Sequence, residues 1–149
     1  MENLFDQSDR SGVERRLRAL TPDAERQWGR MTPSQMLAHC SVGLEYAIGT
    51  RTGKQALLGR LVTPFIRSRL LGERPFAQNA PTGPDFRVTE ERDFEQERAR
   101  LSGLIDRFFR RGAVAAAAQV HPFFGRLSGE EWGRLTFKHL DHHLRQFGV

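Results

Sequence analysis

Two helix start signals constrain the fold of this chain more than any other feature of its sequence. Residues 32–35 read Thr-Pro-Ser-Gln, a capping box with proline in the first helical position. Residues 128–131 read Ser-Gly-Glu-Glu, a second capping box. Each box fixes the start of a helix, because its side chains bind backbone N–H groups that the first turn leaves free. The signals predict helices over residues 33–48, before a terminating glycine, and 129–146.

Apolar spacing predicts three further helical segments. The first runs over residues 11–20, and the second over residues 54–71 with an interruption at Pro64. The third is a long helix that Thr89 caps and Gly112 ends. No run of residues alternates apolar and polar side chains as a half-buried strand would.

These segments predict one all-α domain over residues 1–149, in which residues 1–9 form a loose tail. Four main helices and one long connection are typical of a four-helix bundle with a crossover loop. The connection covers residues 72–88, where proline and glycine are frequent. Loops of this length in compact domains often have a functional role.

Composition points to a cytoplasmic protein. The sequence contains no apolar run long enough for a transmembrane helix, and its first residues lack the basic and apolar regions of a signal peptide. Its single cysteine, Cys40, excludes an intrachain disulfide. We therefore expect a cytoplasmic location and no membrane partner.

Arginine clusters suggest a second possible function, the binding of an anionic partner. The net charge is +5, and the densest clusters lie at residues 15–18 and 107–111. Such clusters can bind phosphate or nucleic acid, or form solvated helix faces and helix ends. Because acidic residues are interspersed through most of the chain, we favour the second interpretation and do not expect nucleic acid as a partner.

Histidines provide the candidate site. His139 and His143 are four residues apart on the last predicted helix, so their side chains project from one face. The apolar pattern of that helix turns this face inward, where unpartnered imidazoles are costly. His39 lies on the inward stripe of the helix over residues 33–48. Three inward histidines on two helices predict a divalent metal site with one open position. His142 points to the side of this group.

Other polar residues near these stripes have two interpretations each. Tyr46 and Gln146 could orient a substrate, support a ligand, or simply be packed inward. His121 either anchors a turn by hydrogen bonds or contacts substrate, and His142 is a candidate supporting residue. Cys40 is either a core thiol or a ligand or nucleophile.

The histidine segments resemble a known group of proteins. Phe137–Gly148, with His139, His143 and Gln146 at spacings of four and three, resembles the last helix of the DinB/YfiT-like superfamily. Trp28–Cys40 resembles the segment that supplies the third histidine there. The sequence around His121 and Trp132 is similar to a bacterial branch of unknown function.

This resemblance implies a four-helix bundle in which His39, His139 and His143 hold one divalent ion, zinc or nickel. Members with known activity include thiol-dependent transferases and isomerases and a metal-dependent hydrolase. We expect a metal-dependent enzyme with a small-molecule substrate, and a low-molecular-weight thiol is a candidate. The alternative is a non-catalytic bundle that binds metal, or that binds nucleic acid or an acidic ligand through arginine. Apolar residues beside arginine over residues 56–71 favour a homodimer.

Overall fold

A computed structural model describes residues 1–72 and 74–149, without the side chains of Ile66, Arg69 and Leu70. The described chain is mostly helical, with five α-helices, one short 3-10 helix and a two-stranded hairpin. The elements in order are α1 (Gln7–Ala19), α2 (Pro33–Ile48), α3 (Leu57–Leu71), η1 (Pro84–Phe86), α4 (Phe94–Ala117), β1 (Val120–His121), β2 (Gly125–Arg126) and α5 (Gly129–Gln146). Within this part of the chain, no helix has the length and apolar character needed to cross a membrane.

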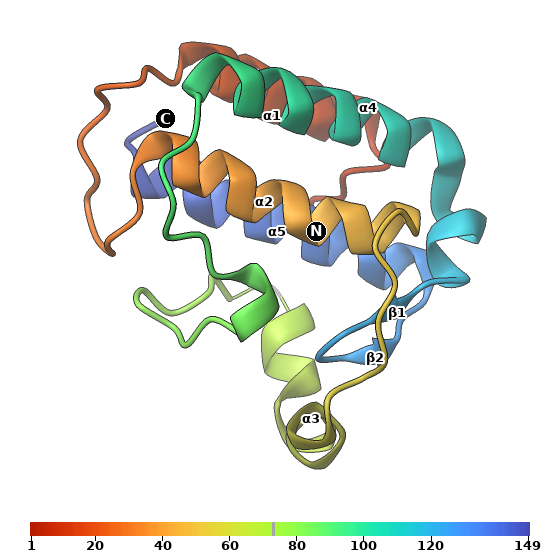
Figure 1. Cartoon of the computed structure of the whole chain (residues 1–149). Helices are drawn as coiled ribbons and strands as arrows, with labels where there is room; N and C mark the ends of the chain where they lie inside the picture. Colours follow the sequence, from red (N-terminus) through yellow and green to blue (C-terminus); the bar gives the residue numbers. More distant parts are fainter. Residues whose placement is uncertain (73) are drawn as a thin grey trace.

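Four of the helices pack side by side around one core. Figure 1 shows α1 beside α4 and α2 beside α5, and these two pairs also contact each other. Helix α3 lies outside the four-helix core, next to the hairpin of β1 and β2 (Figure 1), and it also contacts α5. The core is built from large apolar side chains that water does not reach, among them Leu37, Leu101, Ile105, Phe108 and Trp132. Their burial is the main source of stability. The assignment to a four-helix bundle of DinB/YfiT type stays a prediction.

Both capping boxes form as predicted. Thr32 N–H donates to Gln35 Oε1 at 3.0 Å, and Gln35 N–H donates back to Thr32 Oγ1 at 3.3 Å. Ser128 and Glu131 make the same reciprocal pair at 2.8 and 3.1 Å. Gly49 ends α2 with φ of 74°, in the left-handed region that glycine adopts without strain. The two helices that carry the candidate site therefore have the predicted bounds.

The loose tail predicted over residues 1–9 is wrong. Leu4 is completely buried, and its N–H donates to the carbonyl of Gly133 at 3.1 Å. The side chain of Asp6 accepts from Ser8 and Asp9, so α1 begins at Gln7, four residues earlier than predicted. The lack of a side chain at Gly133 permits this contact, because a Cβ there would lie 1.9 Å from Asn3 Oδ1.

The starts of α4 and α3 also differ from those predicted. Helix α4 begins after Asp93, not Thr89, because the Asp93 carboxylate accepts from Gln96 N–H at 2.8 Å. Helix α3 begins at Leu57 and continues through Pro64. The carbonyl that loses its donor belongs to the exposed residue Arg60, where water can replace the missing bond.

The hairpin over residues 120–126 was not predicted, since each strand has only two residues. Val120 pairs with Arg126, and His121 pairs with Gly125. Gly112 interrupts the backbone of α4 with φ of 76°, and helical turns resume as far as Ala117. The connection predicted over residues 72–88 extends to α4 and contains η1, and Glu73 within it lies outside the described residues.

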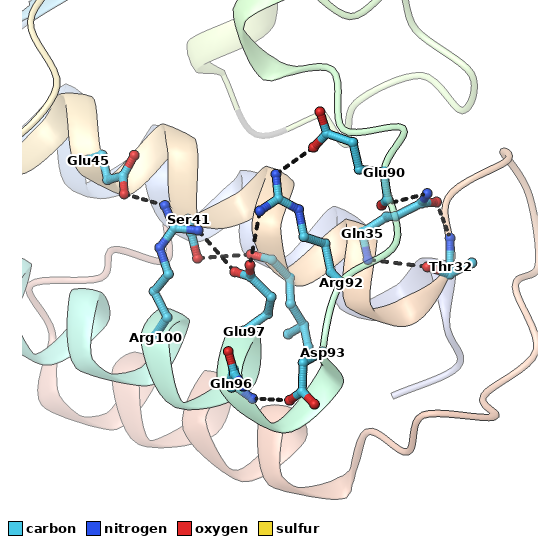
Figure 2. Close-up of polar contacts among 11 residues, drawn as sticks. Thr32, Gln35, Ser41, Glu45, Glu90, Arg92, Asp93, Gln96, Glu97 and Arg100 are labelled. Carbon is cyan, nitrogen blue, oxygen red and sulfur yellow. Dashed lines mark hydrogen bonds and ion pairs between the residues drawn. The ribbon is translucent and has the colours of Figure 1, made fainter.

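Charged and polar residues tie the end of this connection to α2 and α4 (Figure 2). The Gln35 amide donates to the carbonyls of Thr89 and Glu90 at 3.0 and 3.3 Å. Arg92 pairs with Glu90 at 2.7 Å and lies 3.8 Å from Glu97. Arg100 joins the buried Glu97 to Glu45 of α2, as Figure 2 shows. The network holds the segment that follows η1 in place.

Candidate metal centre

The structure brings His39, His139 and His143 together. One ligand nitrogen from each lies within 4.8 Å of the other two. The Nε2 atoms of His39 and His139 are 2.9 Å apart. Within the described residues, this group contains three imidazoles and no carboxylate or thiolate. It joins two helices whose histidines are 100 residues apart in the sequence.

The packing of α2 against α5 sets the positions of these side chains. Gly43 lies one turn after His39 and faces His139, and a Cβ at position 43 would be 3.5 Å from His139 Nδ1. An alanine Cβ would therefore make an ordinary contact with the imidazole of His139, whereas a longer side chain at this position would meet the ring. His143 lies one turn further along α5, with ring centroids of His139 and His143 4.8 Å apart.

Hydrogen bonds orient two of the three rings. His39 Nδ1–H donates to the carbonyl of Phe86 at 2.8 Å, so the lone pair is on Nε2, the atom that faces His139 Nε2. His143 Nδ1–H donates to Gln146 Oε1 at 2.8 Å. The Gln146 amide donates in turn to the carbonyl of Trp28 at 2.7 Å, which fixes which amide atom faces His143. This pattern of a ligand ring held by a second acceptor is typical of histidine metal sites.

Close packing leaves no room for a side chain where the Trp28 segment meets α5. Gly29 has φ of 79°, and a Cβ there would lie 2.4 Å from Gln146 Nε2. Only glycine permits both the backbone conformation and the approach of the amide.

Burial keeps the three imidazoles neutral. Burial lowers the pKa of His39, and it lowers the pKa of His143 to about 3. The pKa of His139 falls well below its usual 6.5, first by burial and then by the neighbouring histidines. Neutral imidazole is the form that binds metal ions, since protonation occupies the lone pair. The donor set therefore fits a divalent ion with three nitrogen ligands and an open position.

Aromatic side chains surround the group. The ring of Phe86 lies 6.1 Å from the ring of His39 and 5.6 Å from that of Tyr46. On the other side, His142 packs against Phe76 and Trp28, with centroids 5.9 and 5.4 Å away. Sequence reasoning missed the roles of Phe86 and Trp28, which act through backbone carbonyls and leave no residue-type signal.

The remaining candidates lie around the group and not in it. His142 is 4.9 Å from His143 between ring centroids, but its nitrogens do not join the three. The Tyr46 hydroxyl donates to Asp85 at 3.5 Å, a long bond. His121 anchors the hairpin, because its Nδ1 accepts from the N–H groups of Phe123 and Phe124. Cys40 is a buried core thiol beside Met36, and burial raises its pKa.

Comparison with known proteins gives one family. No curated protein matches the chain, and no solved structure does. A family model described as a protein of unknown function, DUF1569, matches residues 5–148, which include all five histidines. Because the match spans nearly the whole sequence, the chain belongs to the DUF1569 family.

Proposed function

We propose that this protein is a metal-dependent enzyme of the DinB/YfiT-like type. The proposal rests on three neutral imidazoles whose ligand nitrogens lie within 4.8 Å of one another. Three histidines with an open position are typical of catalytic sites, whereas structural zinc sites have four protein ligands. Zinc and nickel are the candidates, because imidazole suits both ions.

Each residue of the group has a defined task in this proposal. His39, His139 and His143 hold the ion, while the Phe86 carbonyl and the Gln146 amide orient His39 and His143. A divalent ion held by neutral ligands attracts an anionic partner and lowers the pKa of a coordinated water or thiol. The aromatic rings around the group limit the access of water, which strengthens electrostatic interactions inside.

A small molecule is the proposed substrate, and we favour thiol-dependent transfer over hydrolysis. Hydrolysis usually requires a general base that removes a proton from water. The three-histidine group contains no carboxylate within the described residues. A thiol has a pKa of about 8.5 when free, so on binding the ion it would release its proton to solvent without such a base, which favours a low-molecular-weight thiol as partner.

Native mass spectrometry of the purified protein tests the proposal directly. We expect one divalent ion per chain when the protein is purified without chelator, or after zinc or nickel is added to stripped protein. A wild-type protein that refuses both ions would overturn the metal assignment. Bound metal without turnover of thiol or hydrolysis substrates would favour the non-catalytic alternative.

We also propose that the exposed face of α3 binds a second copy of the chain. Four large apolar side chains lie there, with exposed fractions of 73% for Leu57, 67% for Leu58, 64% for Leu61 and 84% for Phe65. Contiguous exposed apolar residues of this size are unusual on a monomer and mark interaction surfaces. Exposed Arg60 among them matches the enrichment of arginine at protein interfaces.

A further inference from the structure

Trp132 carries a buried hydrogen-bond donor for which the described part of the chain offers no acceptor. Its side chain is 1% exposed, and its indole Nε1–H has no partner among the described residues. Native structures rarely bury a donor without an acceptor, because the group loses its bonds to water and gains nothing in return. The ring of His121 lies beside the indole, with centroids 5.3 Å apart.

The ring of His121, beside the indole, carries a second donor. Its Nδ1 accepts from the N–H of Phe123 at 3.0 Å and from that of Phe124 at 3.1 Å. An atom that accepts two hydrogen bonds carries no proton, so the single proton of the neutral ring is on Nε2. Burial lowers the pKa of His121 to about 3, which keeps the ring neutral at pH 7. The described residues give Nε2–H no acceptor.

The ring of His121 borders the proposed metal centre, and Trp132 lies two helical turns from it on α5. The ring of His121 stacks on Phe86, at 6.2 Å and 20°, and the carbonyl of Phe86 holds His39. Trp132 lies on α5 seven residues before His139, two turns along the same face. On α2, a Cβ at Gly43 would lie 3.5 Å from His139 Nδ1 and 3.9 Å from the Phe86 ring, so position 43 places no side chain against these two rings.

We infer that His121 Nε2–H and Trp132 Nε1–H bind an acceptor oxygen of the substrate, next to the metal ion. The inference rests on the proposed function and names the chemical class of its substrate. Two neighbouring neutral donors, with no acceptor beside them, match an oxygen that only accepts, as in a carboxylate or a carbonyl group. The pair makes and breaks no covalent bond; it binds and orients the substrate.

Titration of zinc-loaded protein with acetate and with acetamide tests the pair. The chain has two tryptophans, so a ¹H–¹⁵N spectrum shows two indole signals, and the Trp132→Phe variant identifies the signal of Trp132. We expect acetate to shift that signal in a saturable way. Acetate binding to the same variant, followed on the backbone amide signals of these spectra, should be about 10- to 100-fold weaker, the usual effect of one hydrogen bond to a charged group. A response to acetamide as well would identify a carbonyl oxygen as sufficient; a response to acetate alone would identify a carboxylate.

Two substitutions of His121 separate binding from folding. His121→Asn keeps an acceptor near the position of Nδ1 and loses the Nε2 donor, whereas His121→Gln keeps the donor and loses the acceptor. We expect His121→Asn to weaken acetate binding as Trp132→Phe does, and His121→Gln to bind acetate within a few fold of wild type if it folds. Unchanged affinity in both Trp132→Phe and His121→Asn would overturn the inference.

Zinc content, measured for every variant, separates this inference from the proposed function. Wild-type protein without zinc would overturn the metal assignment. If acetate still shifts the Trp132 signal of such zinc-free protein, the inferred donor pair stands without the metal. If acetate does not shift that signal, the donor pair is overturned as well. Full zinc content with unaltered acetate binding in the variants would overturn the donor pair alone.

Discussion

His142 and His143 are neighbours in the sequence, but only His143 presents a nitrogen to the three-histidine group. Successive residues of a helix point about 100° apart, so their side chains face different neighbours. His142 contacts Trp28 and Phe76 at the edge of the site. This difference makes His142 a natural control for the proposed ligands.

Alanine substitutions should distinguish the three proposed ligands from His142 by how much metal each variant retains. We expect His39→Ala, His139→Ala and His143→Ala to lose metal on dialysis, because each removes one of three ligands. His142→Ala should retain stoichiometric metal and lose at most the 10- to 100-fold in affinity typical of a supporting residue, about 1–3 kcal/mol. Metal analysis after dialysis checks this, and loss from His142→Ala with retention in His143→Ala would contradict the assignment.

The partly buried His121 predicts how the free energy of unfolding depends on pH. Its pKa is lowered from 6.5 to about 3 by burial, so the unfolded chain takes up a proton at a higher pH than the folded chain. The contribution of His121 is therefore complete above pH 6.5 and is lost progressively as the pH falls toward 3. Urea unfolding of metal-free protein at several pH values in this range should show that the free energy of unfolding falls more steeply with decreasing pH for wild type than for His121→Asn. Equal slopes would contradict the prediction.

At the scale of elements, α3 docks on the hairpin through a glycine. A Cβ at Gly59 would lie 2.3 Å from the carbonyl oxygen of Phe123. Nearby, Gln55 and Thr63 both donate to that same carbonyl, at 2.8 and 3.2 Å. Arg67 binds the carboxylate of Glu131 on α5 at 2.7 and 2.8 Å. Helix α3 is thus fixed by its buried side while its apolar outer side stays exposed.

Two glycine-to-alanine variants should therefore change stability in opposite directions. Gly59→Ala forces α3 away from backbone atoms, which we expect to lower the free energy of unfolding by about 1–3 kcal/mol. Gly103→Ala on α4 meets no atom within 4 Å and should raise it by about 0.5–1 kcal/mol, because alanine favours the helix. Urea denaturation measures both. A stable Gly59→Ala variant would show that α3 is not held against the hairpin.

At the scale of the whole molecule, the exposed face of α3 predicts a dimer. Light scattering at tens of micromolar should give twice the chain mass of 17.0 kDa. Leu61→Asp and Phe65→Asp should shift the protein to monomer, because they place charge at the centre of the contact. Val114, which is 89% exposed on α4, offers the matched control, and Val114→Asp should leave the dimer intact. A monomeric wild type would refute the proposed contact.

The sequence by itself determined the bounds of α2 and α5 and the direction of their histidines. Capping boxes act within one turn, and side-chain direction follows from helical spacing, so both are local properties. His39, His139 and His143 could therefore be selected before the structure was known. Their distances, within 4.8 Å, required the packing of α2 on α5.

Only the tertiary structure decided the burial of the N-terminal residues, the start of α4 and the acceptors around the site. These features depend on contacts between distant parts of the chain. Leu4 is buried because Gly133, at the other end of the sequence, leaves space for residues 3–5. Helix α4 is capped by Asp93 instead of Thr89, because Gln35 of α2 holds the carbonyls of Thr89 and Glu90 outside the helix. The acceptors for His39 and Gln146 are backbone carbonyls, which every residue possesses. No spacing or residue type marks such groups, since their role comes from where folding places them.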